Sequence, residues 1–157
     1  MPTEFLLDLE TLDLGAVAID AETVGQMNPQ CGDMRQLDHI AVLDRENRYA
    51  VGIKKVREDE FWVPLHIPGR PLMPGVLMIE AAAQVSSIYH RLISGEDRFL
   101  GFTRCDETSF RGQVIPGDTL VILMQDVKYS PRRFVTRCQG LVDGKLVFQA
   151  GITGMVM

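Results

Sequence analysis

The sequence predicts an α+β domain in which an antiparallel sheet wraps around one long central helix. Three observations lead to this prediction. The chain has 157 residues, enough for one domain with a sizeable core. Segments rich in β-branched residues follow one another across its C-terminal part, separated by turn signals. A single helical segment lies between two groups of such strands and is apolar on nearly every face, so we expect it to be buried all round.

The N-terminal part of the chain is strongly acidic. Residues 1–46 carry a net charge of -8, whereas residues 47–157 carry +3. An ordinary solvated surface would explain this asymmetry. Alternatively, the mildly basic part of the chain, residues 47–157, has an acidic partner, and the acidic N-terminal segment is a separate element that covers it. We interpret residues 1–30 as an acidic N-terminal extension of the single domain 1–157, in which Leu6, Leu9 and Leu12 could form one face of a short helix.

Residues 39–44 and 48–56 are predicted as a strand pair around the polar turn at 45–47. Four further strands are expected at 99–110, 119–127, 134–142 and 145–153. Asp143-Gly144 is typical of a type I′ hairpin turn, and proline marks the turns at 116–118 and 130–132. The C-terminal half is therefore predicted to be an antiparallel meander.

Proline and glycine recur through residues 64–75, which predicts an ordered loop without regular structure. The helix can begin only near Pro74 and is expected to end near Ser94-Gly95, because glycine commonly terminates helices.

An acid, a base and a set of oxyanion donors could come together around the start of this helix: Glu80, His66 and the backbone N–H groups at Gly75. Glu80 and Gln84 are four residues apart, so they share one face of a largely apolar helix. An ionised carboxylate is costly to bury, so Glu80 needs a partner or a proton, which makes it a candidate general acid. His66 is a candidate base, and the N–H groups at Gly75 could hold an oxyanion. Taken singly, a helix glutamate is more often solvated and a loop histidine more often has no role.

Residues 66–84 read H-I-P-G-R-P-L-M-P-G-V-L-M-I-E-A-A-A-Q, which resembles the active-site segment of the FabZ-type 3-hydroxyacyl-[acyl-carrier-protein] dehydratases, H-F-P-G-x-P-x-M-P-G-V-L-x-x-E-A-x-A-Q. Residues 110–118 and 142–147 resemble the F-x-x-x-V-x-P-G-D and V-D-G-K segments of this family. The resemblance covers residues 37–157.

The resemblance implies a hotdog fold and a homodimer, with trimers of dimers also known in the family. It implies that His66 takes the C2 proton of a (3R)-3-hydroxyacyl thioester and that Glu80 of the other subunit protonates or positions the departing C3 hydroxyl. Gly75 and Val76 would bind the thioester, and Gln84 would support Glu80. With glutamate at position 80 and valine at position 76, the chain resembles those enzymes that dehydrate the substrate without isomerising its double bond. The expected partner is an acyl carrier protein in fatty acid biosynthesis, with no cofactor.

Some positions depart from the family pattern. Leu65 stands where the family has glycine, and the segment 105–109 lacks the usual basic residues. The candidates for docking an acidic carrier are Arg104, Arg111, Arg132 and Arg133. Two other functions stay open: a hotdog thioesterase, in which a helix carboxylate activates water, and a non-catalytic acyl-binding subunit.

Other functions are disfavoured by the sequence. His39 and His90 have no companions at metal-ligand spacing, so no metal site is expected. An acidic chain with few aromatic residues argues against nucleic-acid binding, and no apolar run approaches the length of a membrane span. Cys31, Cys105 and Cys138 are widely spaced and read as reduced thiols, which together with the absence of an export signal favours the cytoplasm.

Overall fold

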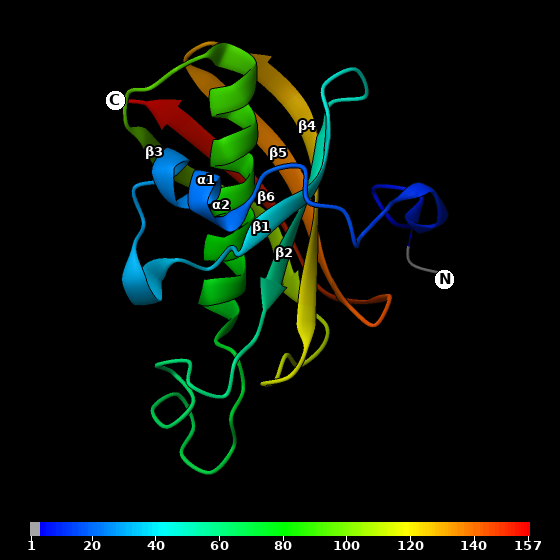
Figure 1. Ribbon diagram of the computed structural model, residues 1–157, viewed down its shortest axis with the longest axis vertical. Coiled ribbons are helices and arrows are strands. Elements are labelled where there is room, and N and C mark those ends of the chain that lie inside the picture. Colours follow the sequence, from blue (N-terminus) through cyan, green and yellow to red (C-terminus); the bar gives the residue numbers. More distant parts are fainter. Residues whose placement is uncertain (1–3) are drawn as a thin grey trace.

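A computed structural model describes residues 4–157 (Figure 1). It confirms the predicted fold class: a six-stranded antiparallel sheet curls around one long helix. The strands are β1 (His39–Asp44), β2 (Tyr49–Lys55), β3 (Leu100–Phe110), β4 (Thr119–Ser130), β5 (Arg133–Val142) and β6 (Lys145–Val156). The helices are α1 (Ala21–Met27) and the central α2 (Gly75–Ser94), with 3-10 turns at Leu9–Thr11 and Gly32–Met34.

The predicted positions of the main elements are confirmed. Helix α2 begins one residue after Pro74 and ends at Gly95, which adopts a left-handed conformation with φ of 69°. Asp143 and Gly144 both have positive φ, as a type I′ turn requires. Strands β4 and β6 extend three residues further than predicted, because long pairing with β5 continues to the turn at 130–133.

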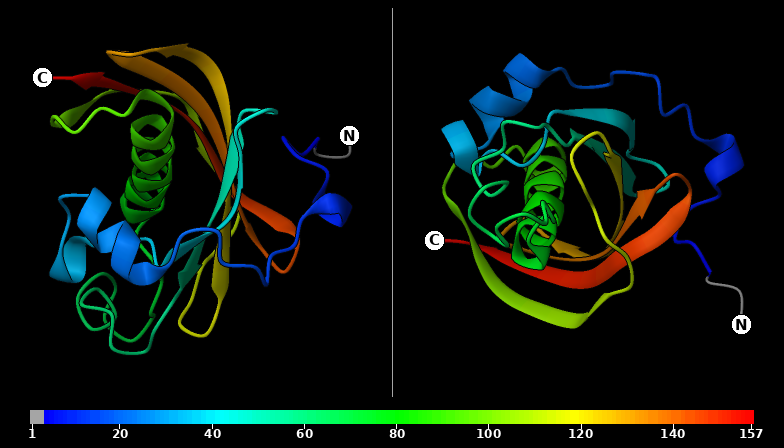
Figure 2. Two further views of the ribbon diagram at one scale, coloured as in Figure 1. Left: turned by 45° about the horizontal axis from the view of Figure 1, so that its top comes forward. Right: turned by 90° about the horizontal axis from the view of Figure 1, so that it is seen from below.

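The predicted meander is correct for β4, β5 and β6 and wrong for β3. The strand order is β1-β2-β4-β5-β6-β3, so β3 lies at the far edge of the sheet beside β6 (Figure 2). The reason lies in the connection after β3. Val114 O accepts a hydrogen bond from Met73 N, and Gly117 N donates to Val56 O, which brings the chain beside the end of β2. Strand β4 therefore starts next to β2 and not next to β3.

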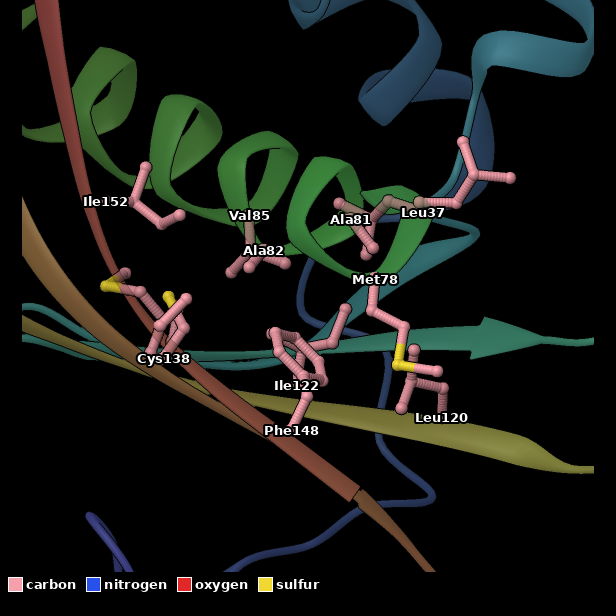
Figure 3. Close-up of a cluster of buried hydrophobic side chains, with 14 of the residues drawn as sticks. Leu37, Met78, Ala81, Ala82, Val85, Leu120, Ile122, Cys138, Phe148 and Ile152 are labelled. Carbon is pink, nitrogen blue, oxygen red and sulfur yellow. The ribbon is translucent and has the colours of Figure 1, made fainter. Parts of the chain in front are cut away.

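The core lies between α2 and the concave face of the sheet (Figure 3). Ala81, Ala82 and Val85 are fully buried on the sheet side of the helix, against Ile122 and Phe148. Small side chains on this face allow the helix to approach the strands closely, which supports tight packing.

Helix α2 is not buried all round within one chain, which corrects the prediction. Val76 is 70% exposed, and Ile79, Glu80, Ala83 and Ser87 are only half-buried. Because 76, 80, 83 and 87 recur at helical spacing, they form one face. Helix α1 and strands β2, β4, β5 and β6 contact the other faces of α2, whereas this face borders a cavity beside the start of β3.

The acidic N-terminal segment falls into two parts with different packing. Its first part crosses the outer, convex face of the sheet, where Phe5, Leu7, Leu9 and Leu12 cover an apolar cluster of Val51, Leu123 and Leu141. Only Leu9 of the expected short helix lies in the 3-10 turn. Its second part includes α1, which sequence patterning did not reveal, and buries Ile19 and Val24 in the main core. The segment is thus not a uniform extension.

Cys31 and Cys105 are exposed and Cys138 is buried, and all three are free thiols. Burial raises the pKa of the Cys138 thiol to about 11. No helix within residues 4–157 has the length and apolar character needed to cross a membrane.

Candidate active site

The loop between β2 and α2 carries His66 and is held in place by two buried groups. Lys54 Nζ and Glu60 Oε1 form an ion pair of 2.7 Å whose side chains are only 1% and 4% exposed. Next to it, Trp62 is buried, and its carbonyl accepts hydrogen bonds from the backbone N–H groups of Leu65 and His66. The proline- and glycine-rich segment is therefore ordered by two buried anchors, although its tip is exposed.

The ring of His66 is held in one tautomer. Its Nδ1 lies 2.8 Å from the carbonyl oxygen of Leu72. Because a carbonyl oxygen can only accept a hydrogen bond, Nδ1 carries the proton and the neutral ring leaves Nε2 unprotonated. His66 borders a cavity of about 350 Å³ with mostly apolar walls, including Leu72, Val76 and Phe110. This arrangement offers a free base nitrogen beside an apolar surface.

The start of α2 opens onto the same cavity. Gly75 and Val76 line it, and Pro74 at the N-cap provides no side-chain hydrogen bond to the first N–H groups. The first turn also contains no acidic residue, so the positive end of the helix is not neutralised locally. These N–H groups can stabilise an oxygen that gains negative charge.

Glu80 is held by a network that runs through Gln84. The buried Gln84 Nε2 donates to Glu80 Oε1 at 2.9 Å and to the carbonyl of Met34 at 2.8 Å. Gln84 Oε1 accepts from the backbone N–H of Gln36 at 2.9 Å. Both hydrogens and the oxygen of this amide are therefore used. The side chain of Asn28 also donates to the backbone carbonyl of Gln84, at 3.2 Å.

Sequence reasoning singled out Glu80 and Gln84 but not Asn28 and Gln36, which contact Gln84 in the structure. These two residues lie more than 45 positions earlier in the chain, where no helical or strand periodicity marks them. Only the packing of the segment after α1 against α2 reveals their contacts. A polar cluster between α1 and β1 was the available sequence signal, but it does not specify a partner.

His66 and Glu80 border different cavities of the chain. His66 lines the 350 Å³ cavity at the start of α2, whereas Glu80 lines a separate cavity of about 140 Å³ between α2 and β3. Within one chain the structure therefore does not bring the predicted acid and base into a common site. Each cavity contains half of the predicted machinery.

The four arginines expected to dock a carrier are spread over the chain. Arg111 follows Phe110 near the first turn of α2, whereas Arg132 and Arg133 lie at the β4–β5 turn near its last turns. A helix of 20 residues is about 30 Å long, so these two ends are far apart. Arg104 lies on β3 and pairs with Asp106 at 2.8 Å. They form no single patch within one chain.

The other histidines and acids in the part of the chain that the structure describes form no group suited to a metal ion. Within residues 4–157, no three His, Cys, Asp or Glu side chains are grouped so that they could hold a metal ion. His90 is fully buried, and its Nε2 lies 2.9 Å from the carbonyl oxygen of Ser130. We assign His90 a structural role at the end of α2.

Comparisons with known proteins show which family this chain belongs to. Residues 28–151 match the family model described as FabA-like domain. The "3-hydroxyacyl-[acyl-carrier-protein] dehydratase FabZ" of Sinorhizobium medicae is 32% identical over 139 residues, covering 88% of this chain and 90% of that protein. The protein of the same name from Desulforamulus reducens is 38% identical over 111 residues, covering 70% of this chain and 78% of its own.

A solved structure supports the fold. "The Dehydratase Heterocomplex ApeI:P" from Xenorhabdus doucetiae matches with a TM-score of 0.73 at 16% identity, covering 85% of this chain and 90% of that one. At this identity the likeness shows the fold alone, whereas the family model and the curated relatives cover most of the chain at higher similarity. The chain therefore belongs to the FabA-like family and, within it, to the FabZ-type 3-hydroxyacyl-[acyl-carrier-protein] dehydratases.

Proposed function

We propose that this chain removes water from (3R)-3-hydroxyacyl thioesters carried by an acyl carrier protein, giving trans-2-enoyl thioesters for fatty acid biosynthesis. The observation that carries the proposal is the hydrogen bond between His66 Nδ1 and the carbonyl of Leu72. It leaves Nε2 free to accept a proton beside an apolar cavity and an uncapped helix N-terminus. The curated relatives named above support the substrate class.

The chemistry uses three groups. His66 Nε2 takes the C2 proton, and the backbone N–H of Gly75 stabilises the negative charge that develops on the thioester oxygen. The electron pair of the broken C2–H bond forms the C2–C3 double bond, and the C3–O bond breaks. Glu80 donates a proton to the departing hydroxyl, which leaves as water. A proton then passes from His66 to Glu80, directly or through water, and restores both groups.

The active site is proposed to form between two copies of the chain. His66 and Glu80 border separate cavities, so a single chain lacks a complete site. The half-buried face of α2 borders the start of β3, which is an edge strand of the sheet. Phe99 and Phe102 are more than half exposed at the start of that edge. A second copy would cover these surfaces and bring its own His66 toward Glu80.

An acidic carrier is proposed to dock on arginines contributed by both copies. Antiparallel pairing of two chains would reduce the separation between Arg111 of one copy and Arg132 or Arg133 of the other. Charges at the rim of an interface act mainly on the rate of encounter, so these residues should affect KM more than turnover.

The three free thiols support the cytoplasmic location expected from the sequence.

Mixing two inactive variants tests the chemistry and the assembly together. Enoyl-thioester absorbance should show activity of the wild-type protein and a loss of about 10²-fold or more in His66→Ala and in Glu80→Gln. If each site takes its two residues from different chains, co-expression of the variants restores about a quarter of the wild-type sites. A site within one chain gives no restoration.

The alternatives predict other results. A thioesterase would release free thiol without forming an enoyl product and would retain activity in His66→Ala. A non-catalytic acyl-binding subunit would show no turnover to lose, and Glu80→Gln would leave its binding intact. The molecular mass in solution distinguishes the proposed dimer from a trimer of dimers and from a chain that pairs with a different protein.

A further inference from the structure

The segment that carries His66, residues 57–72, has one polar contact with the rest of the chain. Within residues 4–157, each hydrogen bond of this segment has both partners inside the segment. The exception among its polar contacts is the ion pair of 2.7 Å that joins Glu60 Oε1 to Lys54 Nζ on β2. Because both side chains are buried, water and salt screen this ion pair far less than an exposed one.

A series of turns leads from this ion pair to His66. Glu60 Oε1 also accepts from the backbone N–H of Arg57, and the carbonyl of Glu60 accepts from Val63 N at 3.1 Å. The carbonyl of Trp62 then accepts from His66 N at 2.8 Å. Because each of these turns overlaps with the next, the position of Glu60 determines where the backbone of His66 lies.

Apolar packing alone does not fix the segment in the same way. Trp62 is buried in the core, yet its Nε1 has no hydrogen-bond partner within residues 4–157. Burial of a ring has no preferred direction, whereas an ion pair that is shielded from water fixes the distance between two atoms. The walls of the His66 cavity come from residues 66–78 and 110–114, so the ion pair does not line it. Any effect of the pair on the reaction must therefore act through His66.

We propose that Lys54 and Glu60 are positioning residues for the dehydration reaction. Their ion pair holds the loop so that His66 Nδ1 meets the carbonyl of Leu72, which leaves Nε2 free beside the cavity. This inference rests on the proposed function of His66 as the base. A buried ion pair adds little net stability over apolar side chains of similar size, but it can specify one arrangement of the chain. A reacting group misplaced by about 1 Å can lower the rate about 10²-fold.

A double variant tests the proposal, because it removes both charges and leaves neither one buried alone. We expect Lys54→Met with Glu60→Leu to fold but to lower kcat for 3-hydroxyacyl thioesters about 10- to 100-fold. KM should stay within about twofold, since the pair does not line the cavity. Asp59→Asn, at the exposed pair with Arg57, is the matched control and should keep the wild-type kcat. A folded double variant with the wild-type kcat overturns the proposal.

Nitrogen NMR of the histidine rings reports on His66 without turnover, with the signals assigned by their loss in His66→Ala. At alkaline pH the neutral ring of His66 should carry its proton on Nδ1, and that of His90 on Nε2, which lies 2.9 Å from the carbonyl oxygen of Ser130. In the double variant we expect both tautomers of His66, whereas unchanged His90 signals show that the fold is intact. Unchanged His66 signals overturn the proposal, even if the wild-type protein dehydrates its substrate.

Glu60→Gln provides the same test if the double variant does not fold. Its amide keeps an oxygen that can accept from Arg57 N, but it carries no charge to pair with Lys54. Its His66 signals are measured at a temperature where the His90 signals show a folded chain. A mixture of His66 tautomers in this variant supports the inference, even if the wild-type protein forms no enoyl product and the proposed function fails.

Discussion

Gly75 shows how one missing side chain shapes the start of α2. A Cβ atom at this position would lie 2.7 Å from Cε1 of Phe110, closer than a Cβ atom approaches a non-bonded carbon in folded proteins. Phe110 packs over the first turn of the helix and also stacks near Phe148, with ring centroids 6.5 Å apart. Glycine therefore allows an aromatic wall and an exposed helix N-terminus to lie in the same cavity.

Gly75→Ala should lower the free energy of unfolding by about 1–3 kcal/mol, because Phe110 must move away from the new methyl group. Urea unfolding measures the change. The same substitution in a Phe110→Leu background should cost less, since the smaller side chain leaves room. Purely additive costs in this double-mutant cycle would show that the ring is not the cause.

The loop that carries His66 depends on the buried ion pair between β2 and the loop. Lys54 and Glu60 are almost completely buried, and Glu60 Oε1 also accepts from the backbone N–H of Arg57. Removing one charge leaves the other buried without a partner, which is far more costly than losing an exposed pair. The Arg57–Asp59 pair is an exposed comparison a few residues away.

Lys54→Met and Glu60→Gln should each destabilise the protein by about 3–5 kcal/mol, whereas the double change Lys54→Met with Glu60→Leu should recover most of this loss. Asp59→Asn, at the exposed pair, should cost less than about 1 kcal/mol. Chemical denaturation of all four variants checks the prediction. Equal costs at the buried and exposed pairs would contradict it.

At the scale of the whole molecule, the N-terminal segment joins the two faces of the sheet. Leu6 N donates to Gln139 Oε1, and Gln139 Nε2 donates to the carbonyl of Glu4, which fixes the start of the segment to the outer face of β5. The chain then passes to the inner side, where Val24 packs in the core and Asn28 contacts α2. These two parts should contribute differently to stability.

Removal of residues 1–14 should keep the fold but expose the outer apolar cluster, so we expect self-association that increases with protein concentration. Removal of residues 1–30 also deletes Ile19 and Val24 from the core and should abolish cooperative unfolding. Thermal unfolding followed by circular dichroism, with light scattering, distinguishes the two. A well-folded 31–157 fragment would contradict this prediction.

Local sequence signals were sufficient for much of this fold. Helix α2, the hairpin turn at Asp143-Gly144 and the six strands were predicted because proline, glycine and β-branched residues act over a few neighbouring positions. Helix α1 was missed, although Asp20 Oδ1 accepts from Thr23 N as an N-cap, because seven residues with one buried side chain give little periodicity. The edge position of β3 was also missed, since strand order depends on long-range pairing.

The sequence by itself predicted which groups are candidates for the reaction. His66, Gly75, Glu80 and Gln84 lie within 19 consecutive positions, so one local motif contains them. Only the tertiary structure decided how these groups are oriented and separated. The free Nε2 of His66 depends on the carbonyl of Leu72, and Gln84 depends on Met34 and Gln36, contacts that folding alone creates. His66 and Glu80 border separate cavities because the loop before α2 and the end of β3 enclose one cavity, whereas the segment after α1 and the start of β3 enclose the other.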